Sequence, residues 1–278
     1  LVFNYVVMAQ ADAMENGLSL RLMKHSDDLN LDEMAHEAVS KAQENFGAKS
    51  LASDAYKVVL DRKVVSSLMS AFASSLSADQ VQKGMSLLQG KLGQKIGSNI
   101  ISLKDDPLHP EAARNKNFDG EGVPIEPTYL IRDGVLENYF YDIETAAKAG
   151  VNRKGNSLRS YKGSKGPGAT CLVLESKTET KSLEELFRDM GEGFYITSLQ
   201  GLHSGLNQVS GDFSLPAQGF LIKDGKKDRP VNQVTVAGNL LELLDHITTV
   251  GSDSDFCMAN HIMSSVLVDK LQVAGEEA

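Results

Sequence analysis

The chain has 278 residues, of which 41% are hydrophobic and 23% are charged, as is typical of a globular protein with a full core. Its 28 Lys and Arg residues against 37 Asp and Glu residues give a net charge of −9, which argues against direct binding to nucleic acid or to an anionic membrane. The sequence has only 2 Cys and no apolar run of the roughly 18 residues that a membrane span needs, so we expect a protein of the reducing cytoplasm.

The N-terminal part of the sequence predicts the end of an α/β domain. Apolar residues at 3–8 and 18–22 favour a pair of strands. A capping box at Asn30 and apolar residues at helical spacing up to Gly47 predict a helix. Because the sequence opens inside an apolar run and not at a Met, we expect residues 1–49 to be the C-terminal end of an α/β N-terminal domain whose remainder is missing here.

The remaining residues, 54–278, predict a domain that is rich in antiparallel sheet. A buried strand over 56–60 is followed by an amphipathic helix over 64–76. Further along, short strands are separated by Gly, Asp and Pro. The Asp-Gly pairs at 133–134 and 224–225 predict tight hairpins, because these residues accept the positive φ that such turns require.

Two more helices begin at capping boxes, which are Ser182 with Glu185 and Asn239 with Glu242. Gly191 predicts the end of the first of them. The fold class is therefore α+β: an antiparallel β-sheet-rich C-terminal domain with a few packed helices, preceded by the end of an α/β N-terminal domain.

The pair His36-Glu37 is the most metal-like signal in the sequence. A zinc peptidase helix needs two histidines about one turn apart and a glutamate that activates water. The residue four positions after His36 is Ser40, and the pair lies on the polar side of its helix, so we interpret it as a solvated helix face. Cys257 and His261 have i, i+4 spacing, but two ligands do not complete a tetrahedral site. Residue spacing therefore predicts no metal site, no cofactor and no catalytic residue.

The densest polar segment spans residues 201–214, between two strand-like stretches. Its glycines permit unusual backbone angles or the close approach of another chain. Two interpretations stay open: a groove that holds an extended peptide, or a tight connection that hydrogen-bonds to itself. In the first, the candidate substrate-binding residues are Gly201, His203, Asn207, Ser210, Gly211, Asp212 and Ser214. A serine nucleophile paired with His203 lacks an orienting group and the Gly-x-Ser-x-Gly elbow.

The glycine-rich residues 162–169 are similar to a phosphate loop only superficially. They lack the Gly-Lys-Ser/Thr ending that supplies a lysine and a magnesium-binding hydroxyl. We therefore expect a mobile surface loop at this position.

Several separated motifs resemble the TldD/PmbA family. They are Asp105-Asp106-Pro107, Phe118 to Pro124, Leu130 to Leu136, Thr145-Ala146, Gly155-Asn156 with Arg159, Ser210 to Ser214, and Pro230 to Asn239. Their order and spacing hold from about Phe3 to Gly275, so the resemblance covers nearly the whole chain. It implies a protein of cytosolic peptide processing, built from two related subunits that trim substrates such as microcin leader peptides. The family's older name, modulator of DNA gyrase, implies an indirect link to gyrase.

One helix separates the two branches of this family. The zinc-bearing TldD branch carries a His-Glu motif and a second His on the helix after a strand like Val58-Val59-Leu60. The corresponding residues here, 66–79, include no His and no Glu. Neutral hydroxyls are poor zinc ligands beside imidazole, thiolate and carboxylate, so the chain resembles the metal-free PmbA (TldE) branch. Arg153-Lys154 departs from the Ser-Thr usual before the Gly-Asn pair of this family.

The resemblance therefore implies the non-catalytic subunit of a TldD/TldE-type metallopeptidase, with a zinc-bearing TldD-like subunit or a second copy as its partner. It would hold an extended peptide by β-augmentation along the strands near 201–214. The alternative is a stand-alone homodimeric peptide-binding or regulatory protein linked indirectly to gyrase. A hydrolase with its own site has little support, because the sequence shows no nucleophile–base pair and no three-ligand set.

Overall fold

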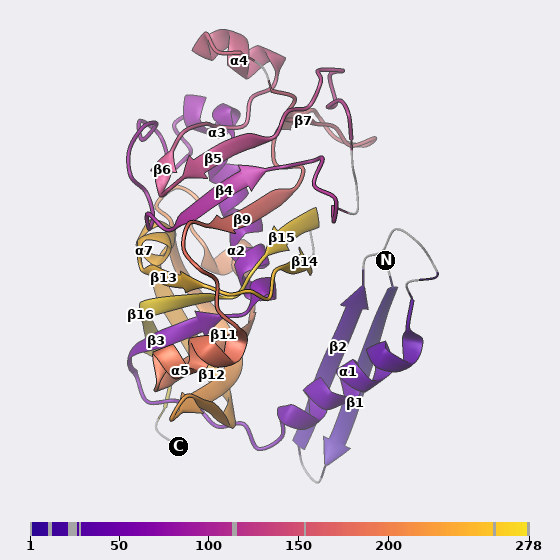
Figure 1. Cartoon of the computed structure of the whole chain (residues 1–278), viewed down its shortest axis with the longest axis vertical. Helices are drawn as coiled ribbons and strands as arrows, with labels where there is room; N and C mark the ends of the chain where they lie inside the picture. The colour runs from indigo at the N-terminus through magenta and orange to yellow at the C-terminus, as the bar shows by residue number, and fades with distance from the viewer. Residues whose placement is uncertain are drawn as a thin grey trace.

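The computed structural model of the chain describes residues 2–10, 13–21, 27, 29–112, 116–152, 154–257 and 260–276. Within this part, a small N-terminal unit lies beside a β-barrel, and a second sheet lies above the barrel in the view of Figure 1. The predicted α+β class is confirmed. Over the same residues, no helix combines the length and the apolar character needed to cross a bilayer.

The N-terminal unit is the predicted strand pair and helix. Strands β1 (Val2–Gln10) and β2 (Ala13–Arg21) pair in antiparallel register, and helix α1 (Leu31–Glu44) packs on one face of them. The contact is close at Gly17, where an added Cβ would lie 1.9 Å from the carbonyl oxygen of Ala38. Glycine is therefore required there, because any side chain would push the helix off the strands. The expected strand residue Leu22 lies outside the described residues.

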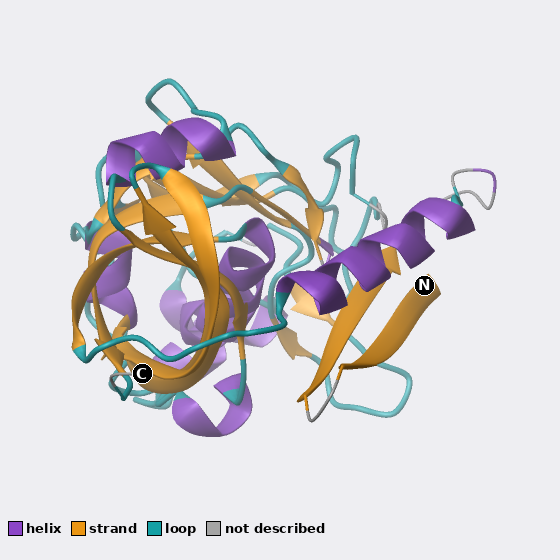
Figure 2. Ribbon diagram, turned by 90° about the horizontal axis from the view of Figure 1, so that it is seen from below, coloured by secondary structure: helices purple, strands orange, loops and turns teal. Residues whose placement is uncertain are grey.

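The barrel closes on itself, as the ring of strands in Figure 2 shows. Its members in spatial order are β12 (Lys226–Asn239), β11 (Asp212–Lys223), β10 (Gly193–Leu199), β3 (Asp54–Leu60) and β16 (Val266–Ala274). Strand β16 pairs again with β12, where Val236 is opposite Val273, and the short β13 (Ile247–Val250) extends the sheet beyond β16. The β3–β10 pair is parallel and the other barrel pairs are antiparallel. Closure through the β12–β16 pair leaves few free strand edges, which are those of β13 and of the first part of β11.

The second sheet is built from short strands. In spatial order they are β14 (Asp255–Cys257), β15 (His261–Met263), β9 (Leu172–Ser176), β4 (Ile101–Asp105), β5 (Thr128–Arg132) and β6 (Val135–Leu136). The remaining elements are α2 (Arg62–Ala73), η2 (Ser74–Leu76), α3 (Ala78–Gln82), α4 (Ile143–Ala149), β7 (Ser157–Leu158), β8 (Gly166–Pro167), α5 (Leu183–Met190), α6 (Leu202–Gly205) and α7 (Leu240–Asp245).

Helix α2 lies between the two sheets and fills the space that joins them. It contacts β10 of the barrel on one side and β14 and β15 on the other. Its Leu68, Met69 and Phe72 are buried in the main hydrophobic core, together with residues of both sheets. A helix that is apolar on most of its surface is stable only when it is surrounded by other elements, and this placement provides that.

The hairpin turns and the positions of the helix N-caps are confirmed, although Asn30 and Asn239 cap their helices by accepting from the N–H groups of Glu33 and Leu241 without the reciprocal bond of a capping box. Asp133 and Gly134 have φ of 48° and 77°, and Asp224 and Gly225 have φ of 50° and 69°, as the two hairpins require. Ser182 and Glu185 form the expected capping box at the start of α5. The expected loop at 162–169 is ordered in part, because Gly166 and Pro167 form β8 and pair with β7.

Candidate functional site

The N-terminal turns of α2 bring together residues that are far apart in the sequence. The side chain of Asp61 caps the helix by accepting a hydrogen bond from the backbone N–H of Lys63 at 2.8 Å. One turn further on, Ser66 and Ser70 face the hairpin of β14 and β15. Their i, i+4 spacing is the spacing that zinc peptidases use for two histidine ligands.

His261 lies between these two serines. Its Nδ1 atom is 3.4 Å from Oγ of Ser66 and 3.3 Å from Oγ of Ser70. The imidazole is 4% exposed, and this burial lowers the pKa of His261 to about 4. At neutral pH the ring is therefore uncharged, and the serine hydroxyls satisfy its buried nitrogen.

Cys257 lies next to His261 in the second sheet. The two residues are opposite each other in the antiparallel β14–β15 hairpin, so their four-residue spacing belongs to a strand pair and not to a helix. The thiol Sγ lies 3.7 Å from the carbonyl oxygen of Arg62, and burial raises the pKa of Cys257 to about 11. The thiol is therefore protonated at neutral pH.

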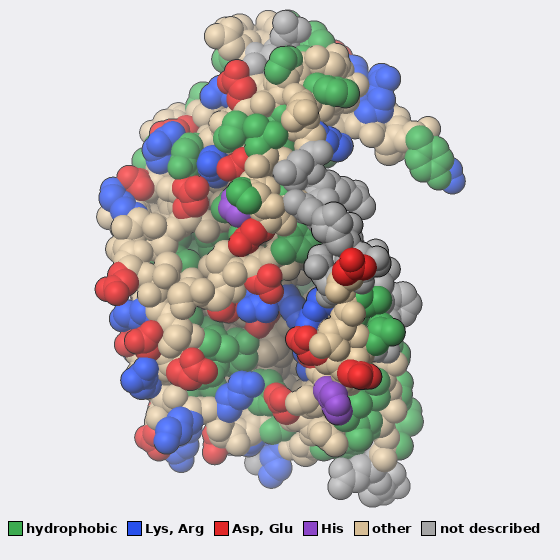
Figure 3. All heavy atoms as spheres, turned by 45° about the vertical axis from the view of Figure 1, so that its right-hand side comes forward, with side chains coloured by type: hydrophobic (Ala, Val, Ile, Leu, Met, Phe, Trp, Pro, Cys, Tyr) green, Lys and Arg blue, Asp and Glu red, His purple; other side chains and the backbone are tan. Residues whose placement is uncertain are grey.

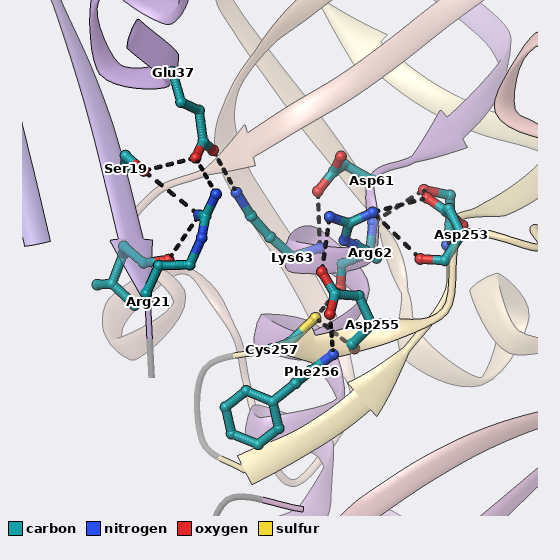
Figure 4. A network of polar contacts seen from close by, with 12 residues as sticks. Ser19, Arg21, Glu37, Asp61, Arg62, Lys63, Asp253, Asp255, Phe256 and Cys257 are labelled. Atoms are coloured by element: carbon teal, nitrogen blue, oxygen red, sulfur yellow. Dashed lines mark hydrogen bonds and ion pairs between the residues drawn. The ribbon is translucent and has the colours of Figure 1, made fainter. Parts of the chain in front are cut away.

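A polar network connects this end of α2 to the N-terminal unit (Figure 4). The Glu37 carboxylate accepts a hydrogen bond from Ser19 at 2.6 Å and lies 2.8 Å from Nη2 of Arg21 and 3.6 Å from Nζ of Lys63; it also pairs with Lys41. Burial alone would raise the pKa of Glu37, but the bonds from Lys41 and Ser19 outweigh it and lower that pKa to about 2.

The interpretation of His36-Glu37 as a solvated face is therefore correct for the exposed His36 and wrong for Glu37. The sequence did not reveal the role of Glu37, because its partners come from β2 and α2 as well as from its own helix. On the far side of the network, Arg62 lies 3.0 Å from Asp255 and 3.8 Å from Asp253. These contacts place the N-terminal unit and the β14 segment around the first turn of α2 (Figure 4).

The segment 201–214 contains the bonds of a tight connection. The Asn207 side chain accepts from the backbone N–H groups of Val209 (2.9 Å) and Ser210 (3.2 Å), and the N–H of Gly211 donates to the Asn207 carbonyl oxygen at 2.8 Å. Asn239, the N-cap of α7, donates to Ser210 O and to the Asp212 carboxylate, both at 2.9 Å. Most polar groups of this turn are therefore engaged within the chain.

A shallow depression borders the same turn. It has a volume of about 480 Å³ and is lined by Ser204, Gly205, Leu206, Asn207, Asp212, Phe213 and Ser214. Of the predicted substrate-binding residues, Asn207, Asp212 and Ser214 thus lie together at this surface, whereas Gly201, His203, Ser210 and Gly211 are not part of its lining. The imidazole of His203 is exposed.

Little free strand edge remains beside the depression. Strand β11 is paired with β12 along its length and with β10 from Ala217 onward. On the β10 side of the earlier part, Leu206 bridges to Phe213 and the N–H of Gln200 donates to Pro216 O at 2.9 Å. An added peptide strand would therefore have only a short edge to pair with.

Most of the chain matches one known domain family. Residues 53–275 match the PmbA/TldA metallopeptidase C-terminal domain, which is most of the chain. The chain belongs to the PmbA/TldD family. The resemblance inferred from the separated motifs is thus confirmed.

Relatives in this family are longer than the chain. The metalloprotease PmbA homologue of Buchnera aphidicola is 28% identical over 276 residues, which are 98% of this chain and 58% of the relative. A metalloprotease of Archaeoglobus fulgidus is 32% identical over 231 residues, or 81% of this chain and 52% of the relative. The chain thus spans little more than half the length of these relatives.

Solved structures share the fold over nearly the whole chain. A proposed modulator of DNA gyrase from Thermotoga maritima has a TM-score of 0.91 and 35% identity, over 98% of this chain and 61% of that one. TldE from Thermococcus kodakarensis has a TM-score of 0.89 and 25% identity, over 98% of this chain and 62% of that one.

The family description raises the question of whether α2 and β15 fit a zinc ion. Zinc in catalytic sites takes three protein ligands from imidazole, thiolate and carboxylate groups. Here the i, i+4 positions of α2 carry the hydroxyls of Ser66 and Ser70, which leaves only His261 and the protonated Cys257. Over the residues that the structure describes, no three His, Cys, Asp or Glu side chains are grouped to hold a metal ion. The donor set of this member of the PmbA/TldD family does not fit zinc.

Proposed function

We propose that this chain is the non-catalytic, zinc-lacking subunit of a TldD/TldE-type metallopeptidase that processes peptides in the cytoplasm. The proposal rests on one observation above all: the two helix positions at which a zinc peptidase needs histidines carry Ser66 and Ser70, whose hydroxyls face His261. A hydroxyl that keeps its proton is a weak ligand for a divalent cation. The activated water of peptide hydrolysis would therefore come from a zinc-bearing TldD-like partner.

We expect the chain to help bind the peptide substrate. The depression lined by Asn207, Asp212 and Ser214 offers an amide, a carboxylate and a hydroxyl to a peptide backbone. Asn239 and Ser210 hydrogen-bond to Asp212 and lower the pKa of that carboxyl, so it is ionised at neutral pH. Because the free edge of β11 is short, we expect contacts from these side chains to contribute more than added strand pairing.

Metal analysis of the purified chain tests the zinc-lacking part of the proposal. We expect no zinc at stoichiometric amounts after exposure to the metal and gel filtration, because the residues that the structure describes contain no group of three His, Cys, Asp or Glu side chains placed to hold the ion. Stoichiometric zinc in the folded chain would refute the proposal.

A peptidase assay with an unstructured peptide tests the subunit role. The chain alone should be inactive, and activity should appear when it is mixed with a zinc-bearing homologue that copurifies with it. A chelator should abolish the activity of the mixture. If the chain alone cleaved the peptide and the chelator stopped this cleavage, the non-catalytic role would be wrong.

A further inference from the structure

Basic residues are unevenly distributed along this acidic chain. Residues 145–174 include six of the 28 Lys and Arg and none of the 37 Asp and Glu, so the rest of the chain carries 22 basic and 37 acidic residues. The middle of this segment, residues 157–167, forms an arm made of β7, β8 and the turn between them. Three of these six basic residues, Arg159, Lys162 and Lys165, lie on this arm.

The tip of the arm extends into solvent. Residues 158–164 are all exposed, and Tyr161 is 92% exposed, the highest value among the large hydrophobic side chains described. Figure 3 shows a finger of the surface at the upper right that carries hydrophobic and basic side chains at its end. The ammonium group of Lys162 lies 5.3 Å from the centre of the Tyr161 ring.

Two cations at this tip lack a partner of opposite charge. Lys165, near the base, is neutralised by Glu121 at 2.6 Å and Asp142 at 3.5 Å. In contrast, Arg159 and Lys162 form no ion pair with any residue that the structure describes. Arginine and tyrosine are, with tryptophan, the residue types enriched among energetic hot spots of protein interfaces, and Arg159 and Tyr161 lie two positions apart.

The base of the arm is held firmly, so the tip is presented in a defined direction. The Asp119 carboxylate accepts hydrogen bonds from the N–H groups of Glu121 (2.8 Å), Val123 (2.9 Å) and Ser157 (2.9 Å). An aromatic and cationic tip on a fixed base loses little conformational freedom on binding.

A second carboxylate braces the other side of the base. Asp105, which is 1% exposed, accepts from the N–H groups of Thr170 (2.9 Å) and Cys171 (2.7 Å) and from the side-chain amide of Asn156 at 3.3 Å. The carbonyl of Asn156 in turn accepts from Gly168 at 3.0 Å. Both strands of the arm are therefore anchored to buried groups.

We propose that residues 157–167 are a docking arm that binds an acidic surface of a second copy of this chain, with Tyr161 as the apolar anchor and Arg159 and Lys162 as the charged contacts. Charge complementarity favours this occupant, because outside residues 145–174 acidic residues exceed basic ones by 37 to 22. In a two-fold dimer each arm contacts the other subunit, so the contact is made twice.

The same charge distribution disfavours a nucleic acid as the occupant. Binding to a polyanion needs a broad basic surface that neutralises many phosphates. Only the arm segment is basic here, and the remaining surface of the chain would repel the phosphate backbone. A protein surface with a few carboxylates matches two cations and one ring better.

Sedimentation equilibrium of the full chain, at several protein concentrations and two salt concentrations, tests the proposal. We expect a dimer whose dissociation constant rises with salt, because exposed charges contribute to the contact. The double variant R159E/K162E should raise the dissociation constant by at least about tenfold, and Tyr161→Ala should raise it by a similar factor. These side chains are exposed, so the thermal unfolding midpoint should not change.

The matched control is K223E/K226E, which changes the net charge by the same amount at the exposed tip of the β11–β12 hairpin. This variant should keep the dissociation constant of the wild type within about twofold, the range of exposed charges away from an interface. An equal weakening by both double variants would show that net charge, and not the arm, controls association, and the proposal would then be wrong.

Two other outcomes overturn the proposal. The first is a wild-type chain that stays monomeric at low salt and high concentration. The second is a chain that is monomeric alone but binds a zinc-bearing homologue through Arg159 and Lys162, since the occupant is then that homologue. Neither outcome depends on whether the chain holds zinc, so the arm and the proposed function can fail separately.

Discussion

Helix α2 and the arm at 157–167 satisfy their polar groups in opposite ways. At α2, the hydroxyls of Ser66 and Ser70 and the ring of His261 are turned toward each other between two sheets. On the arm, Arg159, Tyr161 and Lys162 extend outward from a base held by buried carboxylates. The helix positions at which zinc peptidases bind metal are thus satisfied by contacts within this chain, whereas the arm leaves charge and apolar surface for a partner.

The largest expected effect is a gain of zinc binding at α2. The triple variant S66H/S67E/S70H would place two imidazoles one turn apart beside His261, with a glutamate between them in the sequence. Three nitrogen ligands are the number of a catalytic zinc site, so we expect stoichiometric zinc in the variant and none in the wild type. Isothermal titration with zinc and metal analysis measure this gain.

The control for the gain of zinc is the double variant S67H/A71H, which puts two histidines at i, i+4 but turned by about 100° around the helix from Ser66 and Ser70. Two ligands do not complete the site, so zinc should bind at least about tenfold more weakly than in the triple variant. In the triple variant, the larger side chain at the buried Ser66 position should lower the free energy of unfolding by about 1–3 kcal/mol when no metal is bound. Equal zinc affinities in the two variants would contradict the placement of His261.

The next largest effect separates the core of α2 from the arm tip. Phe72 is 0% exposed in the main core, and Phe72→Ala should lower the free energy of unfolding by about 3–5 kcal/mol through lost burial and a cavity. Tyr161→Ala should change it by less than about 0.5 kcal/mol, because the ring is in solvent. Urea unfolding of both variants measures the difference. A large loss of stability in Tyr161→Ala would mean that the arm is packed against the body of the protein.

A pH effect of intermediate size is expected at the base of the arm. Burial raises the pKa of Asp105 to about 6, despite hydrogen bonds from Cys171, Thr170 and Asn156 that lower it. Between the ordinary pKa of an aspartate and this value the folded state binds more protons than the unfolded state. The stability contributed by Asp105 is therefore present at low pH and is lost as the pH rises toward and past 6.

Asp105→Asn removes this proton-binding difference. Relative to the variant, the wild type should lose about 2 kcal/mol of unfolding free energy between roughly pH 4.5 and pH 7. Urea unfolding of both proteins at the two pH values isolates the contribution of Asp105, since the other titrating groups cancel in the comparison. A parallel pH dependence in the two proteins would show that the pKa of Asp105 is not raised.

The smallest expected effect is a loss of conformational rigidity in the arm. Asp119→Ala removes the acceptor for the N–H groups of Glu121, Val123 and Ser157, at a cost of about 1–2 kcal/mol. Because the loss is local, trypsin should cut after Arg159 and Lys162 faster than in the wild type. Mass spectrometry of timed digests follows the cleavage. Asp228→Ala, at an exposed position of β12, should leave the rate unchanged, and an unchanged rate in Asp119→Ala would show that this carboxylate does not brace the arm.

Local signals in the sequence predicted several elements of the fold, whereas the strands β13 to β16 and the helices α3, α4 and α6 were not predicted. The Asp-Gly hairpins, the cap at Asn30 and the capping box at Ser182 each depend on residues within about four positions of one another, so the sequence pattern alone contains them. The β-rich character of residues 54–278 followed in the same way from alternating strands and turns. Barrel closure did not, because Val236 and Val273 meet only after the intervening elements have packed.

The candidate site was predicted only in part, because some of its contacts join residues that are far apart in the sequence. The two interpretations of 201–214 could not be separated by sequence, since the bonds from Asn239 to Ser210 and Asp212 come from another strand end. The basic run around the arm was readable in the sequence, but its unpaired tip was not. Lys165 finds partners and Arg159 does not, and only the positions of Glu121 and Asp142 decide that.

By itself the sequence determined family membership, the acidic balance and the lack of His and Glu in the helix after β3, because these depend on residue identity and order. Only the tertiary structure decided that Ser66, Ser70 and His261 share one contact and that Asp105 and Asn156 brace one arm. Such pairs lie 51 to 195 positions apart in the chain. Their approach is set by the packing of the two sheets around α2, which no local pattern encodes.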